Sequence, residues 1–472
     1  MHQNWLGIGF CFILVPIITL LPGFADTSSL AAEARAGVAV KHPIAVVPHG
    51  SSSHSKNDSS PKPALAAPAA PQPSPVVNRV SAPVGQGLPA FDDIMNEALV
   101  TRGIPGGALA IAKDGKLLVA RGYGMANAQT REPVTLDTLF CTATITRTIT
   151  AVAVLRLVDQ GKLSLDDAVY PLLGKPRPLG RPTIDSQVQK ITVRQLLLHA
   201  GGWNSKYHSD VLRQTQKISK AAAEKLPLSA DAVLRYGLSQ RLDFAPGSET
   251  HYSNFGYFLA KLVVQCSARQ PYETYVRQEV LRPMGINEMR IEQLAPAYAA
   301  HEAHRYGSGG RELPGGRELI AAPAGNWLAS IVDLARFLTA VSGTRGKPFL
   351  TSAARQQMLA VPPLPLMPRR GGSHVSLGWD SVTEEPRGIQ FHKSGLAAGV
   401  RTYIEHRSDG IDWVLLLNSD GQAPDRPPAA SEIIDKIRQS IDATRDWPDR
   451  DLFESPVASP APRKTPKGSV VL

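Results

Sequence analysis

Two Asp-Gly dipeptides, each between apolar runs, constrain the fold of this chain more than any other feature. Asp114-Gly115 separates GGALAIAK from KLLVARGYG, and Asp409-Gly410 separates VRTYIEHRS from IDWVLLLN. Asp-Gly between such runs is typical of a tight turn joining two antiparallel strands, because both residues tolerate a left-handed backbone. The sequence therefore predicts a β-hairpin near each end of the folded part.

Outside the hairpins the apolar pattern is that of helices and loops. A helix is predicted over 91–100 and another from about Ile145 to Gly161, since glycine commonly follows a helix end. The stretch SEIIDKIRQSI, after the second hairpin, predicts a closing helix. These patterns predict an α/β (α+β) fold, in which an antiparallel sheet from both chain ends is flanked by helices and an all-helical subdomain is inserted.

The first 25 residues have the pattern of a targeting segment. Leu6–Ala25 is almost wholly apolar, and small residues at Gly23 and Ala25 suit a signal-peptidase cut before Asp26. The run is also long enough to span a bilayer, and the start MHQNW contains no Lys or Arg. We therefore expect residues 1–25 to be a signal peptide or an N-terminal anchor. The protein is then expected to be exported, to the periplasm or outside the cell, with membrane contact only if the anchor remains.

Two further segments lack the large apolar side chains that a folded core needs. Residues 26–88 are rich in Ser, Pro and Ala, and the last residues, 441–472, have a similar composition. Such segments cannot offset the entropy lost on ordering, so we expect a disordered linker and a disordered tail. The folded domain is predicted to cover 89–440.

The formal net charge of +10 is the one hint of a polyanionic partner. The excess of Lys and Arg is spread over the folded region, without a dense basic run or a stretch where basic and aromatic residues alternate. We therefore expect no nucleic acid as a partner. The three cysteines, Cys11, Cys141 and Cys266, are too few for a disulfide framework or a four-thiolate zinc site, and pairing of the last two is left open.

Three short motifs contain residues of the kind that hydrolytic sites use. They are FCTATITR at 140–147, YSN at 252–254 and KSG at 393–395. In the first, a hydroxyl residue and a cation stand three positions apart, a spacing that a helix places on one face. Each motif alone has a structural explanation, such as a buried tyrosine with a partner for its hydroxyl.

In their context these motifs resemble those of the penicillin-recognising serine hydrolase superfamily, in the branch of class C β-lactamases, D-Ala-D-Ala peptidases and related esterases. The resemblance covers roughly Leu88 to Gly421. It rests on the stretches PGGALAIAKDGKLLVARGYG, AVLRLVDQGKLSLDDAV, ITVRQLLLHAGGW, FAPGSETHYSNFGYFLAKLV, NWLASIVDLARFL and HKSGLAAGVRTYIEHRSDG. It implies a cleft that takes a small peptide, ester or β-lactam-like ligand. We expect no cofactor and no metal.

The resemblance also implies roles for single residues. Thr144 stands at the position of the nucleophilic serine, and Arg147 at that of the lysine that takes its proton. Tyr252 would be the proton shuttle and Asn254 a hydrogen-bond donor to the ligand amide. Lys393 would offset the charge of a ligand carboxylate or assist the tyrosine.

The third motif would supply the rest of the binding surface. Ser394 stands where the family has threonine, and Gly395 would let the strand approach a bound ligand closely. By the same resemblance, the backbone N–H groups of Leu396 and Thr144 would form the oxyanion hole.

Both residues of the first motif depart from the family pattern. Arginine is not deprotonated in proteins, so Arg147 cannot accept a proton from a nucleophile. Threonine keeps a hydroxyl, but its methyl group crowds the attacking position and restricts χ1. The displaced Ser-x-x-Lys matches, Ser53–Lys56 and Ser59–Lys62, both lie in the expected linker. The sequence therefore predicts a catalytically impaired family member, a pseudoenzyme with a cleft-binding or regulatory role.

Two other functions stay open. One is a working amide or ester hydrolase of the D-Ala peptidase, β-lactamase or esterase type, with Thr144 as nucleophile and Tyr252, beside Lys393, as base. The other is an envelope protein that interacts with partners through its linker and tail.

Three further sets of residues are predicted to be structural. His199, in LLLHAGGW, is expected to be a core or loop residue. His301 and His304 have a helix-like spacing, but no third ligand is near them in sequence, so a metal site is not expected there. Cys141, three positions before Thr144, is expected to be a buried inert thiol rather than a replacement nucleophile.

Overall fold

The computed structural model describes most of the chain between Leu88 and Glu454. The described ranges are 88–181, 183–205, 210–292, 298–307, 310–314, 326–363, 365–366, 372–421 and 429–454. The expected signal peptide or anchor, the linker up to residue 87 and the last part of the expected tail lie outside them.

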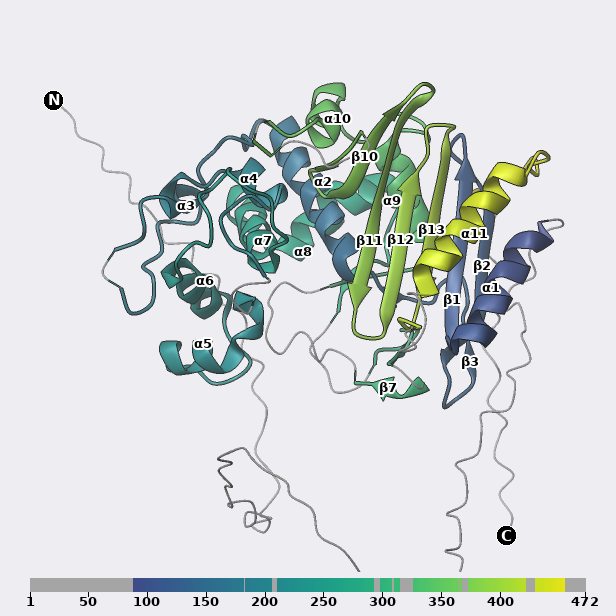
Figure 1. Cartoon of the computed structure of the whole chain (residues 1–472), viewed down its shortest axis with the longest axis horizontal. Helices are drawn as coiled ribbons and strands as arrows, with labels where there is room; N and C mark the ends of the chain where they lie inside the picture. Colours follow the sequence, from purple (N-terminus) through teal and green to yellow (C-terminus); the bar gives the residue numbers. More distant parts are fainter. Residues whose placement is uncertain are drawn as a thin grey trace, which may run out of the picture. The chain divides into compact units, whose positions relative to one another are not determined.

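An eight-stranded antiparallel sheet forms the centre of the described part (Figure 1). Its strand order is β3-β2-β1-β13-β12-β11-β10-β9. The strands are β1 (Gly106–Lys113), β2 (Lys116–Asn127), β3 (Glu132–Pro133), β9 (Ser373–Ser376), β10 (Trp379–Glu385), β11 (Gly388–Ala397), β12 (Val400–His406) and β13 (Ile411–Leu417). The first long strand pairs with the last, with Ala110 opposite Val414, so the two ends of the folded chain meet in one sheet, as predicted.

Both predicted hairpins are confirmed. Asp114 and Gly115 adopt left-handed φ angles of 51° and 79° between β1 and β2. In the second turn the Arg407 N–H donates to the Ile411 carbonyl at 2.8 Å, and Gly410 has a φ of 81°. The Asp114 N–H donates to the Gly410 carbonyl at 3.0 Å, so the two turns lie side by side.

Each face of the sheet is covered by its own pair of helices. Leu109 and Ile111 of β1 pack into one apolar cluster with α1 (Pro89–Arg102) and α11 (Ala429–Ala443), which lie side by side in Figure 1. The alternate residues of the same strand are alanines, and they pack into the main cluster with α2 (Thr146–Asp159) and α9 (Ile331–Ser342). The two-residue alternation of a strand thus separates two cores.

Helices also make up most of the inserted region between α2 and α9. They are α3 (Val169–Leu172), α4 (Val193–Leu197), α5 (Thr215–Ala222), α6 (Ala230–Ser239), α7 (Asn254–Ala268) and α8 (Tyr272–Tyr275). Short strands accompany them, namely β5 (Arg290–Ile291), β6 (Arg305–Tyr306), β7 (Glu312–Leu313) and β8 (Trp327–Ala329). The strand β4 (Phe140–Cys141), which pairs with β8, precedes α2, and α10 (Ser352–Leu359) follows α9. Helix α2 ends before Gly161, whose φ is 65°, as the sequence predicted. Within the described ranges, no helix combines the length and apolarity needed to cross a membrane.

The boundary predicted after residue 440 is wrong, because residues 441–454 belong to the folded part. Ile441 of α11 is 3% exposed and Phe453 is 6% exposed. The Phe453 ring packs against two guanidinium groups, with Arg336 Cζ at 4.7 Å and Arg345 Cζ at 4.6 Å from its centroid. This packing and hydrogen bonds between the same stretch and β2 hold it on the domain, and composition alone does not reveal them.

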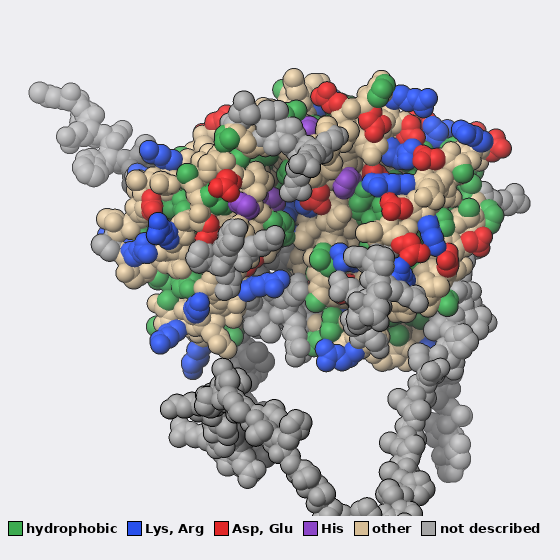
Figure 2. All heavy atoms as spheres, viewed as in Figure 1, with side chains coloured by type: hydrophobic (Ala, Val, Ile, Leu, Met, Phe, Trp, Pro, Cys, Tyr) green, Lys and Arg blue, Asp and Glu red, His purple; other side chains and the backbone are tan. Residues whose placement is uncertain are grey.

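Figure 2 shows how the charged side chains are distributed over one face of the protein. Lys and Arg side chains are scattered over this face, with Asp and Glu between many of them.

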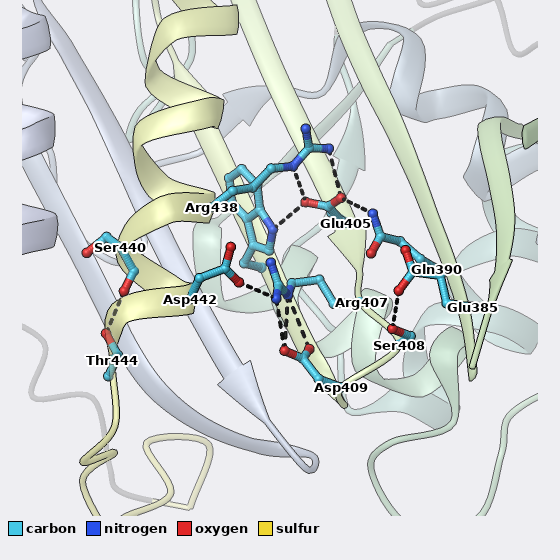
Figure 3. Close-up of polar contacts among 11 residues, drawn as sticks. Glu385, Gln390, Glu405, Arg407, Ser408, Asp409, Arg438, Ser440, Asp442 and Thr444 are labelled. Carbon is cyan, nitrogen blue, oxygen red and sulfur yellow. Dashed lines mark hydrogen bonds and ion pairs between the residues drawn. The ribbon is translucent and has the colours of Figure 1, made fainter. Parts of the chain in front are cut away.

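A buried carboxylate attaches α11 to the sheet (Figure 3). Glu405 of β12 is fully buried and accepts hydrogen bonds from Trp413 Nε1 at 2.7 Å and from Gln390 Nε2 at 3.1 Å. Arg438 of α11 donates to both of its carboxylate oxygens, at 2.8 and 3.1 Å. A carboxylate without water needs such partners, so removal of the arginine would leave a buried charge unpaired.

We predict that Arg438→Ala lowers the free energy of unfolding by about 2 kcal/mol, less than for a fully buried pair because the arginine side chain is 32% exposed. Lys436→Ala is the matched control, since it removes a surface cation of the same helix that pairs with Glu97 and Glu432. Urea unfolding should show little change for this control. Equal losses in the two variants would contradict the role given to Glu405.

Candidate active site

The first motif presents its hydroxyl from a strained turn. Thr144 lies in the short 3₁₀ helix Ala143–Ile145, immediately before α2, and Ala143 has a left-handed φ of 47°. Such an angle is uncommon for a residue with a side chain and is often found at functional sites. The Thr144 Oγ1 donates to the Ser394 carbonyl at 2.7 Å. The first and third motifs therefore meet, but the hydroxyl proton is directed at a carbonyl oxygen, which is not a base.

Arg147 lies one turn further along, at the start of α2, and its guanidinium reaches the second motif. Its Nη2 donates to Asn254 Oδ1. Its Cζ lies 4.9 Å from the ring centroid of Tyr252 and 5.8 Å from that of Tyr257, both cation–π distances. Among the described residues its buried Nε has no hydrogen-bond partner. The guanidinium thus connects the first motif with the second.

The second motif stands at the start of α7. Ser253 caps this helix by accepting the Gly256 N–H, which fixes the residues on either side of it. Tyr252 Oη donates to Asn254 Oδ1 at 3.0 Å, and Asn254 Nδ2 donates to Asp210 Oδ2. The amide of Asn254 therefore accepts from two groups and donates to a third within the protein.

The surroundings of Tyr252 keep its hydroxyl protonated. Removal of water by the neighbouring protein raises the pKa of this phenol, and the Arg147 guanidinium offsets only part of that effect. A neutral phenol is a weak base, so Tyr252 needs help from another group to accept a proton.

The third motif lies on β11, and its lysine already has an acidic partner. Lys393 is 3% exposed, and its Nζ donates to Asp380 Oδ1 of the neighbouring strand β10. The other oxygen of Asp380 accepts the Ser394 N–H at 2.9 Å. Burial lowers the pKa of Lys393, Arg147 lowers it further, and Asp380 opposes both.

Gly395 and Leu396 continue this strand. A Cβ added at Gly395 would lie 1.8 Å from Thr402 Oγ1 and 2.9 Å from the Thr142 carbonyl, so only glycine lets β11 lie against the turn that carries Thr144. Leu396 is 49% exposed. The role of the Leu396 and Thr144 N–H groups as an oxyanion hole stays a prediction.

His199 lies behind the second motif. Its ring is buried, its Nδ1 accepts the Ser253 N–H at 3.1 Å, and its centroid is 5.0 Å from that of Tyr252. Burial and the charges of Lys393 and Arg147 hold the pKa of this imidazole well below its usual range. His199 is therefore a neutral, hydrogen-bonded support for Tyr252, in agreement with its predicted structural role.

The helix-like spacing of His301 and His304 does not correspond to a helix. His301 is exposed with a φ of 62°, and the chain then enters the strand β6. His304 Nδ1 lies 2.7 Å from Glu312 Oε1, and its Nε2 lies 3.3 Å from Asn127 Nδ2. Across the described ranges no group of three or more His, Cys, Asp or Glu side chains is arranged to hold a metal ion.

Cys141 and Cys266 form no disulfide with each other in the described part of the chain. Cys141 is 3% exposed in β4 and packs in a small apolar cluster, as expected for a buried thiol.

Two residues of the site were not predicted from the sequence. Asp380 reaches Lys393 only because Ser381 pairs with His392, which brings β10 and β11 into register. Asp210 reaches Asn254 from a segment between α4 and α5. Neither carboxylate belongs to a motif, so no local pattern indicated it.

Comparisons with known proteins agree with this geometry. The family profile described as "Beta-lactamase" matches residues 91–436. Protein flp of Staphylococcus aureus (strain COL) is 28% identical over 236 residues, which are 50% of this chain and 43% of that protein. Esterase EstB of Burkholderia gladioli is 31% identical over 217 residues, 45% of this chain and 54% of the esterase. The chain thus spans about half the length of these relatives.

Solved structures share the fold. The octameric penicillin-binding protein homologue from Pyrococcus abyssi is 24% identical with a TM-score of 0.58, over 73% of this chain and 76% of that chain. D-alanine carboxypeptidase AmpC from Burkholderia cenocepacia is 22% identical with a TM-score of 0.58, over 74% of this chain and 98% of that chain.

The neutral state of His199 gives a prediction for the pH dependence of stability. Its pKa in the folded protein lies below the ordinary value of 6.5, so below that pH the unfolded chain binds a proton that the folded chain does not. The stability that His199 contributes is therefore complete above about pH 6.5 and is lost as the pH falls, by up to about 1.4 kcal/mol per pH unit.

His199→Asn tests this, because asparagine offers an acceptor to Ser253 and tolerates the left-handed φ of 57° at this position. Urea unfolding at about pH 7.5 and about pH 5 should show the wild type losing its advantage over the variant on acidification. A difference that stays constant with pH would contradict the buried neutral imidazole.

Proposed function

Because the chain belongs to the β-lactamase family, whose members bind β-lactam, peptide or ester substrates in a cleft, we propose that its site binds such a ligand without efficient acyl transfer. The protein then acts as a cleft-binding or regulatory member of a family of serine hydrolases. The observation that carries this proposal is the position of Arg147, on Asn254 and beside Tyr252.

Acyl transfer requires a group that removes the proton of the nucleophile as it attacks. Arg147 occupies the position from which the family's lysine would do this, and a guanidinium stays protonated. Tyr252 is held as a neutral phenol, and Lys393 is bound to Asp380. The Thr144 hydroxyl therefore has no evident acceptor for its proton among these groups, which supports impaired catalysis.

Ligand binding does not depend on that proton transfer. The strand β11 still lies beside the Thr144 turn, and the apolar side chains of Tyr252 and Leu396 are 42% and 49% exposed. These features support a site that is able to hold a ligand even though its first motif has changed.

A working amide or ester hydrolase is the second candidate. The observations that favour it are the retained hydroxyl of Thr144 beside β11 and the lowered pKa of Lys393, which leaves a larger fraction of this amine unprotonated than of a surface lysine. Esterase EstB, among the relatives, is named for such an activity.

We further propose that the protein is exported, with residues 1–25 as a signal peptide or anchor. The support is the apolar run Leu6–Ala25 with small residues before Asp26. N-terminal sequencing of the mature protein distinguishes cleavage from an anchor.

The catalytic proposal is tested with a fluorescent penicillin and with p-nitrophenyl butyrate. We expect no covalent labelling of the wild type and no ester turnover above background. Thr144→Ser combined with Arg147→Lys removes the crowding methyl group from the hydroxyl and replaces the guanidinium by an amine that can accept a proton, so ester turnover should rise about a hundredfold or more.

The matched control is Thr144→Ala combined with Arg147→Lys, which restores the amine without a nucleophile and should stay inactive. Labelling of the wild type at Thr144, or wild-type turnover that Thr144→Ala abolishes, would contradict impairment and establish the hydrolase.

A further inference from the structure

Each of the two cations at the site has a carboxylate close to it. Lys393 binds Asp380 directly, and Arg147 is linked to Asp210 through the amide of Asn254. All four charges are close enough to act on the groups around Tyr252. Two positive and two negative charges therefore balance at the centre of the site.

The other titratable groups nearby do not change this balance. His199 is neutral, because burial, Lys393 and Arg147 oppose its protonation. Tyr252 is a neutral phenol. Arg213 also acts on Tyr252, but it is exposed, and water screens its charge.

Asp380 changes the charge that a ligand meets at Lys393. A buried ammonium with no acidic neighbour would attract a ligand carboxylate, which is one of the two roles that the family resemblance implies for this lysine. Here the position beside the ammonium is taken by a carboxylate that is fixed by a second hydrogen bond, from the Ser394 N–H at 2.9 Å. The Asp380 side chain is 40% exposed, so its negative charge also faces an incoming ligand.

Two large side chains, one aromatic and one aliphatic, are exposed at the site. Tyr252 is 42% exposed at the start of α7, and Leu396 is 49% exposed on β11, two positions after the residue whose carbonyl accepts from Thr144. Exposed apolar side chains beside balanced charges favour a ligand that buries apolar surface and brings no net charge.

We propose that Asp380 is a positioning residue that sets ligand specificity, so that this site prefers uncharged acyl esters or amides to ligands that carry a carboxylate. It acts through Lys393, whose charge it satisfies, and through its own negative charge. The inference rests on the proposed function, since it concerns the same site.

Benzylpenicillin and its methyl ester form a matched pair of probes, because they differ in the negative charge of one carboxylate. Their binding to the full chain is measured by isothermal titration calorimetry, for the wild type and for Asp380→Asn. The wild type should bind the methyl ester more tightly than the acid. In Asp380→Asn the ratio of acid to ester affinity should rise about tenfold or more, since one charge is removed a few ångströms from the lysine.

Two further variants separate charge selection from a general effect on the fold. Asp380→Glu keeps the carboxylate and should keep the preference for the ester. Glu384→Gln removes an exposed carboxylate elsewhere on β10 and should leave the ratio unchanged. A purely structural role of Asp380 would weaken both probes together and would not change their ratio.

The outcomes separate this inference from the proposed function. If both probes bind and Asp380→Asn leaves the ratio unchanged, the inference is wrong while the binding site stands. A wild type that prefers the acid also overturns it. If neither probe binds to any variant, the proposed binding function fails, and the inference fails with it.

Discussion

The pairing of β1 with β13 is the interaction on which the rest of the structure depends. It joins strands from the two ends of the folded chain, from Gly107 opposite Leu417 to Lys113 opposite Ile411. Everything between them is one long closed loop, and the entropy of closing a loop grows only slowly with its length. A large helical insertion is therefore tolerated. Because β12 and β11 are added to β13 in turn, the same ladder also sets the position of the third motif beside Thr144.

The substitution of a guanidinium for an ammonium reorganises the polar groups of the site. A lysine amine is a compact charge, whereas the planar fork of Arg147 donates to Asn254 and lies over the Tyr252 ring. By the family resemblance, Asn254 and Lys393 would contact a ligand. Here they bind protein carboxylates, since Asn254 binds Asp210 and Lys393 binds Asp380. Internal hydrogen bonds of this kind stabilise the arrangement of these side chains.

Features fixed by local chemistry were predictable from the sequence. The Asp-Gly turns and the glycine after α2 depend on backbone angles that few residues tolerate, and the structure has them where they were expected. The meeting of the first and third motifs was implied by family resemblance. The spacing of His301 and His304 was misleading, because two residues three positions apart are neighbours on a helix but can equally stand in an irregular turn.

Features that depend on long-range packing were not predictable. In the sequence, Asp380 and Asp210 have nothing that distinguishes them from surface aspartates. Strand register brings Asp380 to the site, and the position of a loop brings Asp210 there. The folded part continues past residue 440 because Phe453 packs near two arginines of a distant segment and the same stretch forms hydrogen bonds with β2. Composition describes a segment by itself and does not reveal the residues elsewhere in the chain against which it packs.

The Lys393–Asp380 pair has a consequence for how such domains can recombine. The two residues lie on consecutive strands, and only the short turn after Glu385 separates β10 from β11. A genetic exchange with breakpoints outside this hairpin transfers both charges together, as one module. A breakpoint within the turn would pair a buried ammonium with whatever residue the other parent carries on β10. The hairpin, rather than the single lysine, is therefore the unit that transfers this charge pair.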